Sequence, residues 1–575
     1  MALADEHADT CTLLVETLLV NEHADSLAPL MAAEAGRCTA MRSLMSLTVE
    51  GEIIKPTEES GPALISSAEH LVELMGHITN AKGEGTLLFY SYLEAEEGTP
   101  PSGQLDGATA AADVAVGAEA GGETVTKSAR ADQASADQLV LWVIDGSGKV
   151  VLTRRMRAVC SDGRSLDQVI SDVHSKASLA FDGVTTRGPV VTPESSTARI
   201  QDLKARGVAT DADTSIDTPD SGLPTGPRPV SLDPELQLLF ELLIQPAVPY
   251  LIKDAPLVLI PHMVLQLVPF TALHSADGGP LIDAHPITTA PSLSILRTLI
   301  ARSTIAAAKV ADIGTASLVV GDARPASSFE LPPLPFTKIE SVEIAACLKS
   351  EPLLADAATA RAVGSEMASK PFCCIHLACH SRPRCLAFAP LISDATRELV
   401  ATAHTAAEKA AECCAVDGEE SDAAKAAFAA YEAASEAAAA ANAEMQAAEQ
   451  LGPIADGLLM IESLSQLPLH GHPTVVLAGS HSGAGHVSHD SVNGLPRLFL
   501  CAGARSVLSC AWDAADEATS HLMRAFHKAL AADPTLSQAE ALRQAINSTR
   551  KAEAGRWAHP AYWASFTLIG ASKGI

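Results

Sequence analysis

The stretch VVLAGSHSGAG, residues 475–485, decides how the fold is interpreted. An apolar run that opens into Ser, His and Gly predicts a buried strand with a tight polar loop at its carboxyl end, which is where α/β folds present reactive side chains. The upstream stretch IHLACHSRPR, residues 375–384, has the same form and places His380 and Ser381 directly after an apolar run. If the two strands are neighbours, His380 and Ser480 meet over one edge of the sheet, where a histidine can take a proton from a nucleophile.

Short apolar runs alternate with amphipathic helical patterns along most of the remaining chain. This alternation is typical of βαβ units, so we predict an α/β fold with a mainly parallel sheet covered on both faces. Strands are predicted at 85–95, 139–156 (a hairpin turning at Asp145-Gly146), 256–262, 317–322, 372–379, 474–479, 506–512 and 563–570, and helices at 235–252, 292–303, 337–349, 358–369, 495–500, 518–530 and 537–551.

Composition divides the chain into a short N-terminal region and one large domain. Residues 1–65 have apolar positions at helical spacing, and we expect a helical region there, followed by a single domain over 66–575. Within that domain, 94–135 has no apolar period and predicts a disordered insertion, and 205–233 is rich in Pro, Gly, Asp and Thr and predicts a linker. The Ala-rich stretch 395–450 predicts one or two long helices that leave the main core, since an Ala face buries little area.

Charge and length limit the classes of partner. The chain has 575 residues and a net charge of −29, which disfavours nucleic acid and anionic membrane surfaces as partners. We find no run of about 18 apolar residues that could span a bilayer, and the acidic start MALADEHADT does not resemble a secretory signal. The 12 cysteines are scattered and match neither a disulfide framework nor zinc knuckles. We therefore expect a soluble cytoplasmic protein with free thiols, and protein or peptide partners.

Two other kinds of site are set aside. His376 and His380 have the H-x-x-x-H spacing of metal ligands on a helix, but on a strand four residues span about 13 Å, which is too far for shared coordination. The nucleophile motif G-x-S-x-G of α/β-hydrolases is also missing, because the middle residue of 479–483 is His481. We predict neither a metal nor another cofactor.

Several ordered segments resemble one family. From about residue 65 onward the chain is similar to the CHAT domain, a caspase-like module related to separase and caspases. The segments that carry the resemblance are VLIPHMVLQLVPFTALHSADGGPLID, TTAPSLSIL, LLADAATARAV, CIHLACHS, GLPRLFLCAGARSVLSCAWDAADEATSHLMRAFHKAL and HPAYWASFTLIG, with an opening hairpin in GTLLFYSYLEA and LVLWVIDGSGKVV. The resemblance implies a caspase-like, three-layer α/β sandwich with N-terminal helices and a long Ala-rich helical insertion.

The resemblance also implies where a proteolytic dyad falls. The family histidine corresponds to His380, and the family cysteine corresponds to Ser480. Ser381 stands where a glycine often follows the histidine, and with Gly479 it forms the loops whose backbone could face an oxyanion. Asp490 and His481 are the candidates for substrate binding: Asp490 either holds a basic side chain or orders its loop, and His481 is otherwise a solvated loop residue.

The replacement of cysteine by serine decides between hypotheses for function. A thiol is partly ionised near neutral pH and a neighbouring histidine assists it, whereas a serine hydroxyl needs a strong, well-oriented general base. The residues are compatible with a catalytically impaired CHAT domain that serves as a regulatory or interaction module, and the serine favours this hypothesis. The alternatives are an active endopeptidase that uses His380 and Ser480, oriented by His481 or Asp490, and a scaffold that acts through the N-terminal helices.

Overall fold

A computed structural model describes most of the chain. The described residues are 27–35, 37, 48–49, 52–53, 65, 67–93, 137–181, 184–187, 230–313, 316–329, 331–417, 422–449, 454, 456–465, 467–487 and 492–572. The predicted disordered insertion at 94–135 lies outside them, and so does the predicted linker up to residue 229.

An 11-stranded sheet forms the centre of the fold, in the order β5-β4-β3-β6-β7-β18-β17-β14-β10-β8-β9. Neighbouring strands from β3 to β9 run parallel, except that β18 is antiparallel to β17, and the antiparallel hairpin of β4 and β5 forms the other end. The predicted mainly parallel sheet is therefore confirmed. Its strands are β3 (Thr86–Leu93), β4 (Gln138–Ile144), β5 (Val150–Arg157), β6 (Leu257–Ile260), β7 (Ile287–Thr289), β8 (Ser317–Gly321), β9 (Pro352–Leu354), β10 (Cys374–Leu377), β14 (Thr474–Leu477), β17 (Ser506–Cys510) and β18 (Phe566–Gly570).

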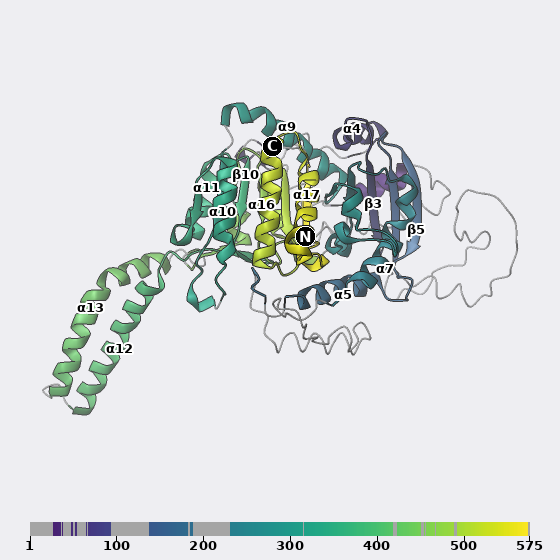
Figure 1. The fold of residues 1–575 in the computed structure, drawn as a ribbon. Coiled ribbons are helices and arrows are strands. Elements are labelled where there is room, and N and C mark those ends of the chain that lie inside the picture. Colours follow the sequence, from purple (N-terminus) through teal and green to yellow (C-terminus); the bar gives the residue numbers. More distant parts are fainter. Residues whose placement is uncertain are drawn as a thin grey trace, which may run out of the picture.

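Helices cover both faces of this sheet (Figure 1). In β14, Val476 points into one hydrophobic core while Val475 and Leu477 point into the other, as alternation along a strand requires. The first core includes side chains of α5 (Leu166–Leu179), α7 (Asp233–Leu243), α10 (Pro335–Leu348), α16 (Asp516–Ala532) and α17 (Gln538–Lys551), and the second includes those of α4 (Ala68–Ile78), α9 (Leu293–Ile313), α11 (Ala360–Ser369) and α15 (Leu495–Ala502). The result is a three-layer α/β sandwich.

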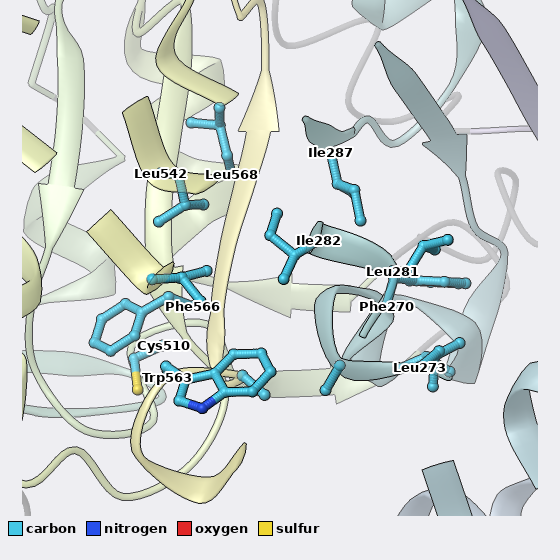
Figure 2. Close-up of a cluster of buried hydrophobic side chains, with 14 of the residues drawn as sticks. Phe270, Leu273, Leu281, Ile282, Ile287, Cys510, Leu542, Trp563, Phe566 and Leu568 are labelled. Atoms are coloured by element: carbon cyan, nitrogen blue, oxygen red, sulfur yellow. The ribbon is translucent and has the colours of Figure 1, made fainter. Parts of the chain in front are cut away.

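Part of the first core lies between β18 and the segment before β7. Figure 2 shows Phe566 and Leu568 of β18 beside Leu542 of α17, with Ile282 of the short helix α8 (Leu281–Ala284) facing them. The sulfur of Cys510 lies at the edge of this cluster, and the residue is fully buried. The cluster packs β18 against α8, a helix from a much earlier part of the chain, on the same face of the sheet.

The described part of the N-terminal region packs on the domain. Helix α2 (Leu27–Ala35) places Leu30 in the second core. The buried carboxylate of Glu34 accepts the backbone N–H groups of Leu293 and Ser294 at 2.9 and 2.7 Å, at the start of α9. A carboxylate at this position satisfies N–H groups that have no partner within a helix. Two further residue pairs in this region form the small hairpin of β1 (Thr48–Val49) and β2 (Glu52–Ile53).

The Ala-rich stretch forms two long helices, α12 (Asp394–Asp417) and α13 (Asp422–Glu449). They pack against each other as a hairpin that projects away from the sandwich (Figure 1). Their shared cluster of buried side chains consists of Val400, Ala403, Ala438 and Ala441. Such small side chains bury little apolar area, in accordance with the composition of the segment.

Three small sheets were not predicted: the β1–β2 hairpin, which lies where only helices were expected, and two sheets at the carboxyl edge of the large sheet. One consists of β11 (His380–Arg382), β12 (Cys385–Ala387) and β13 (Leu458–Met460), and the other of β15 (Gly485–Val487) and β16 (Val492–Gly494). Strands of three residues are too short to give a periodic pattern. The short helix α14 (Ile461–Leu464) follows β13. Among the described helices, none is long and apolar enough to cross a membrane.

Candidate functional site

Strands β10 and β14 are neighbours, as the sequence suggested. They pair in parallel with Leu377 opposite Leu477, so the segments that follow the two strands leave the sheet at the same edge. The segment after β10 carries His380 and Ser381, and the segment after β14 carries Gly479 and Ser480. The side-chain hydroxyl of Ser381 donates to the backbone carbonyl of Ser480 at 2.6 Å, which joins the two segments directly.

His380 is buried and oriented by one hydrogen bond. Its Nε2 lies 2.8 Å from the carbonyl oxygen of Pro332. Since a carbonyl can only accept, Nε2 carries the proton and Nδ1 keeps its lone pair. Among the described residues, Nδ1 has no hydrogen-bond partner. Burial lowers the pKa of this imidazole, and the Pro332 carbonyl opposes that effect in part. The ring is therefore neutral at pH 7 and could act as a base through Nδ1.

Ser480 is fully buried, and its hydroxyl oxygen is hydrogen-bonded to a residue other than His380. Its Oγ accepts the backbone N–H of Ala514 at 2.9 Å, and no hydrogen bond joins it to the His380 ring in the described structure. The preceding residue, Gly479, has no room for a side chain, because a Cβ there would lie 2.2 Å from the Ser381 hydroxyl and 2.6 Å from the Cys379 carbonyl oxygen. The two loops therefore approach each other closely at this position.

Two backbone N–H groups converge on a single oxygen at the centre of the site. The N–H of Ser381 and the N–H of Ser480 each donate to the carbonyl oxygen of Arg187, at 3.3 Å in both cases. Two convergent backbone donors are the arrangement that stabilises an oxyanion in acyl transfer. The two donors come from Ser381 and Ser480, whereas Gly479 allows the two loops to approach closely; the oxyanion role of Ser381 and Gly479 stays a prediction.

The Arg187 side chain occupies a buried pocket with two carboxylates. Its Nε donates to Asp516 Oδ1 at 2.8 Å, and its other nitrogens donate to both oxygens of Glu340 and, at 3.1 Å, to the carbonyl of Ala478. All three charged side chains are at most 1% exposed. Burial would lower the pKa of Arg187, but Glu340 and Asp516 outweigh it and raise that pKa above its ordinary value.

Glu340 links this pocket to a pair of buried histidines. His376 of β10 lies 2.8 Å from Glu340, and its other ring nitrogen lies 3.2 Å from His527 of α16. Burial would raise the pKa of Glu340, yet Arg187 and the His376 hydrogen bond together lower it to about 2. His376 thus serves an internal polar network. In the part of the chain that the structure describes, no group of three or more His, Cys, Asp or Glu side chains could hold a metal ion.

The predicted substrate-binding residues have different outcomes. His481 adopts a left-handed backbone conformation with φ of 55°, and its Nε2 lies 3.2 Å from the carboxylate of Asp513, which is buried. Its side chain is 32% exposed, so it lies at the surface of the site and does not line the Arg187 pocket. Asp490 lies outside the described residues. The carboxylates that hold a basic side chain here are Glu340 and Asp516.

The nearby cysteines are packed core residues. Cys379 and Cys510 are buried, and burial raises the pKa of each thiol to about 12. Neither thiol is ionised near neutral pH, so neither is suited to act as a nucleophile in this site. An apolar cavity of about 110 Å³ lies beside His380, with Phe329, Leu331 and Leu458 among its lining residues.

Comparison with known proteins assigns the family. The family model for the CHAT domain matches residues 233–571, which is more than half of the chain. The chain therefore belongs to the CHAT domain family. The match includes His380, Ser480, Glu340 and Asp516, whereas Arg187 precedes it.

Two curated relatives match only a small part of this chain. Tetratricopeptide repeat protein 28 of Mus musculus is 34% identical over 118 residues, which make up 20% of this chain and 5% of that protein. Tetratricopeptide repeat protein 28 of Homo sapiens is 35% identical over 105 residues, or 18% of this chain and 4% of that protein. The chain thus spans a small fraction of the length of either relative.

Solved structures with some similarity include a separase–securin complex and a cysteine proteinase. A Saccharomyces cerevisiae separase–securin complex aligns with a TM-score of 0.46 and 10% identity, covering 99% of this chain and 36% of that chain. The Arg-specific cysteine proteinase gingipain R aligns with a TM-score of 0.33 and 9% identity, covering 60% of this chain and 69% of that chain.

Proposed function

We propose that this CHAT domain is a peptide-binding module whose peptidase chemistry is impaired at the nucleophile. The observation that carries the proposal is the state of Ser480. Its hydroxyl accepts a hydrogen bond from Ala514 and makes none with His380 in the described structure, although His380 has a free lone pair on Nδ1. A serine that is not hydrogen-bonded to its base is a poor nucleophile, since the hydroxyl is far less acidic than a thiol.

The parts of the site that bind a polypeptide do not depend on the nucleophile. The two convergent N–H groups, the buried carboxylates of Glu340 and Asp516, and the backbone of the segment after β17 are all in place. A site that keeps these elements and lacks a reactive thiol is suited to hold a peptide without cutting it. We place its partner among proteins or peptides, because the net charge of −29 repels nucleic acid and anionic lipid.

Free thiols support an intracellular setting for this module. Eight of the cysteines among the described residues, including Cys160, Cys379 and Cys510, are free. Unpaired cysteines are typical of reducing compartments such as the cytoplasm.

The second candidate function is an active endopeptidase with a His380 and Ser480 dyad. It is favoured by one observation, the unpartnered Nδ1 of His380, whose lone pair is available to accept a proton. The pair of His481 and Asp513 does not assist the dyad in the present geometry, because its hydrogen bond is directed away from His380 to a separate carboxylate.

A serine-reactive phosphonate probe separates the two candidates. The full chain is treated with the probe, and the variants Ser480→Ala and His380→Ala are treated in parallel. The proposal predicts that the wild-type chain and both variants show no labelling that depends on Ser480. Labelling of the wild-type chain that disappears in both variants would establish the endopeptidase and reject the proposal.

A further inference from the structure

The segment Val184–Arg187 pairs with residues 514–516 beside the site through one antiparallel bridge. The Arg187 N–H donates to the carbonyl of Ala514 at 2.9 Å, and the Asp516 N–H donates to the carbonyl of Thr185 at 2.9 Å. Thr186 and Ala515 form an antiparallel bridge between these bonds. Pairing with an exposed backbone edge is a general way in which proteins bind extended peptides, with the main chain providing affinity and alternate side chains providing specificity.

Three independent sets of contacts converge on Arg187. Its backbone pairs with the segment after β17, its carbonyl oxygen accepts the N–H groups of Ser381 and Ser480, and its guanidinium meets two buried carboxylates. A structural ion pair would require only the third set. The backbone pairing and the two N–H donors place the carbonyl carbon of Arg187 where an acyl group would be held for attack, next to Ser480.

The contacts of Arg187 are all distant in the chain. Glu340 is 153 residues away and Asp516 is 329 residues away, so the segment is bound as a ligand from elsewhere would be. The described residues 184–187 contribute one bridge residue and neither a helix nor a strand of the large sheet. The position of Arg187 is thus set by the site and not by local secondary structure.

We propose that Arg187 is an intramolecular occupant of the peptide site, held in the position of an arginine whose carbonyl faces the two backbone donors. The inference rests on the proposed function, since it identifies the ligand of the same site. The site accordingly recognises an arginine in an extended peptide, and an external peptide of this kind binds only when the Val184–Arg187 segment is displaced. The segment therefore regulates the site from within the chain.

The test removes the guanidinium that anchors the Val184–Arg187 segment, so that an added peptide can displace it. The full-length variant Arg187→Ala is titrated by calorimetry with acetyl-Val-Thr-Thr-Arg-amide, which copies residues 184–187, and with the same peptide carrying citrulline in place of arginine. Citrulline keeps the shape and removes the charge. Because an unpaired buried charge is costly, the arginine peptide should bind at least about 30-fold more tightly than the citrulline peptide.

Two control proteins define the background. The wild-type chain should bind neither peptide measurably, because its pocket is filled. The variant Arg164→Ala removes another arginine that pairs with several carboxylates, Asp162, Asp172 and Glu235, away from this site, and it should behave as the wild-type chain does. Equal binding of both peptides to Arg187→Ala, or no binding of the arginine peptide, would overturn the proposal. Tight binding of the arginine peptide by Arg164→Ala would do the same.

A second measurement applies if Arg187→Ala does not fold alone. The variant is then refolded in an excess of either peptide, and the native fraction is followed by circular dichroism. Folding with the arginine peptide and not with the citrulline peptide supports the proposal, and failure with both overturns it. Neither result depends on the reactivity of Ser480, whereas phosphonate labelling of Ser480 would reject the proposed function without any information on Arg187. Failure of the Arg187 proposal and failure of the proposed function are therefore distinguishable.

Discussion

Replacing Glu340 by glutamine tests the buried charge cluster against a matched surface position. The variant Glu340→Gln keeps the size of the side chain and removes one of the two carboxylates that neutralise Arg187. The Glu340 pKa is lowered from its ordinary value of 4.5 to about 2, and this difference corresponds to about 3 kcal/mol of folding free energy. Breaking one side of a buried ion pair costs about 3–5 kcal/mol in general, so the two figures agree.

Glu343 provides the control on the same helix. It pairs with Arg524 at 2.8 Å and with Lys528 at 2.7 Å, but its side chain is 35% exposed. Surface ion pairs contribute about 0.2–1 kcal/mol, so Glu343→Gln should cost far less than Glu340→Gln. Urea unfolding of both variants and of the wild-type chain measures the difference. Equal losses in the two variants would refute the claim that the Glu340 cluster is buried and charged.

The pH dependence of the unfolding free energy provides a second, independent test of Glu340→Gln. Because the folded-state pKa of Glu340 lies below the unfolded-state value, its contribution is present above pH 4.5 and is lost as the pH falls towards about 2. The difference in unfolding free energy between the wild-type chain and Glu340→Gln should therefore shrink over this interval. A difference that stays constant between neutral pH and pH 3 would contradict the assigned pKa.

Three further predictions concern neighbouring residues. Gly479→Ala should lower the unfolding free energy by about 1–3 kcal/mol, because its Cβ would lie 2.2 Å from the Ser381 hydroxyl oxygen. Gly364→Ala, whose Cβ would have no neighbour nearer than 3.8 Å, should raise the unfolding free energy by about 0.5–1 kcal/mol. Thermal unfolding that ranks the two variants in the opposite order would disprove this. Ser480→Cys should react with iodoacetamide faster than the buried Cys379, whose pKa is about 12, and equal or slower reaction would count against a histidine facing that position. Burial and a neighbouring histidine lower the pKa of His527 well below 6.5, so the unfolding free energy should fall as the pH drops below 6.5. His527→Gln should make the unfolding free energy less dependent on pH in this range. An unchanged pH dependence would show that His527 is not buried in its neutral form.

The fold followed from the hydrophobic pattern wherever the elements were long enough. The runs that became β10 and β14 and the amphipathic stretch that became α16 were placed from sequence alone, because burial on both faces leaves a continuous apolar run and burial on one face leaves a helical period. The three-residue strands β7 and β9 were missed. Strands of that length are defined by their neighbours in the sheet and not by their own composition.

The site was only partly predictable. His380 and Ser480 were proposed because each follows an apolar run and because the family resemblance marks them, and their catalytic role stays a prediction. Arg187 was not found, since no local period distinguishes it and its partners are 153 and 329 residues away. Glu340 lies within the helix predicted at 337–349, but sequence alone does not show that a second charge is buried beside it. The roles of Arg187 and Glu340 depend on contacts between distant segments, and such contacts cannot be predicted from a single sequence.

Intact-protein mass spectrometry of Ser480→Cys tests the central claim most directly. A thiolate at this position would attack the carbonyl carbon of Arg187, the amine of Gly188 would leave with a proton, and water would release the acyl group. We predict that Ser480→Cys separates into residues 1–187 and 188–575, while the wild-type chain and the double variant Ser480→Cys with His380→Ala stay whole. Cleavage of the wild-type chain, or a Ser480→Cys chain that reacts with iodoacetamide yet remains whole, would contradict the account.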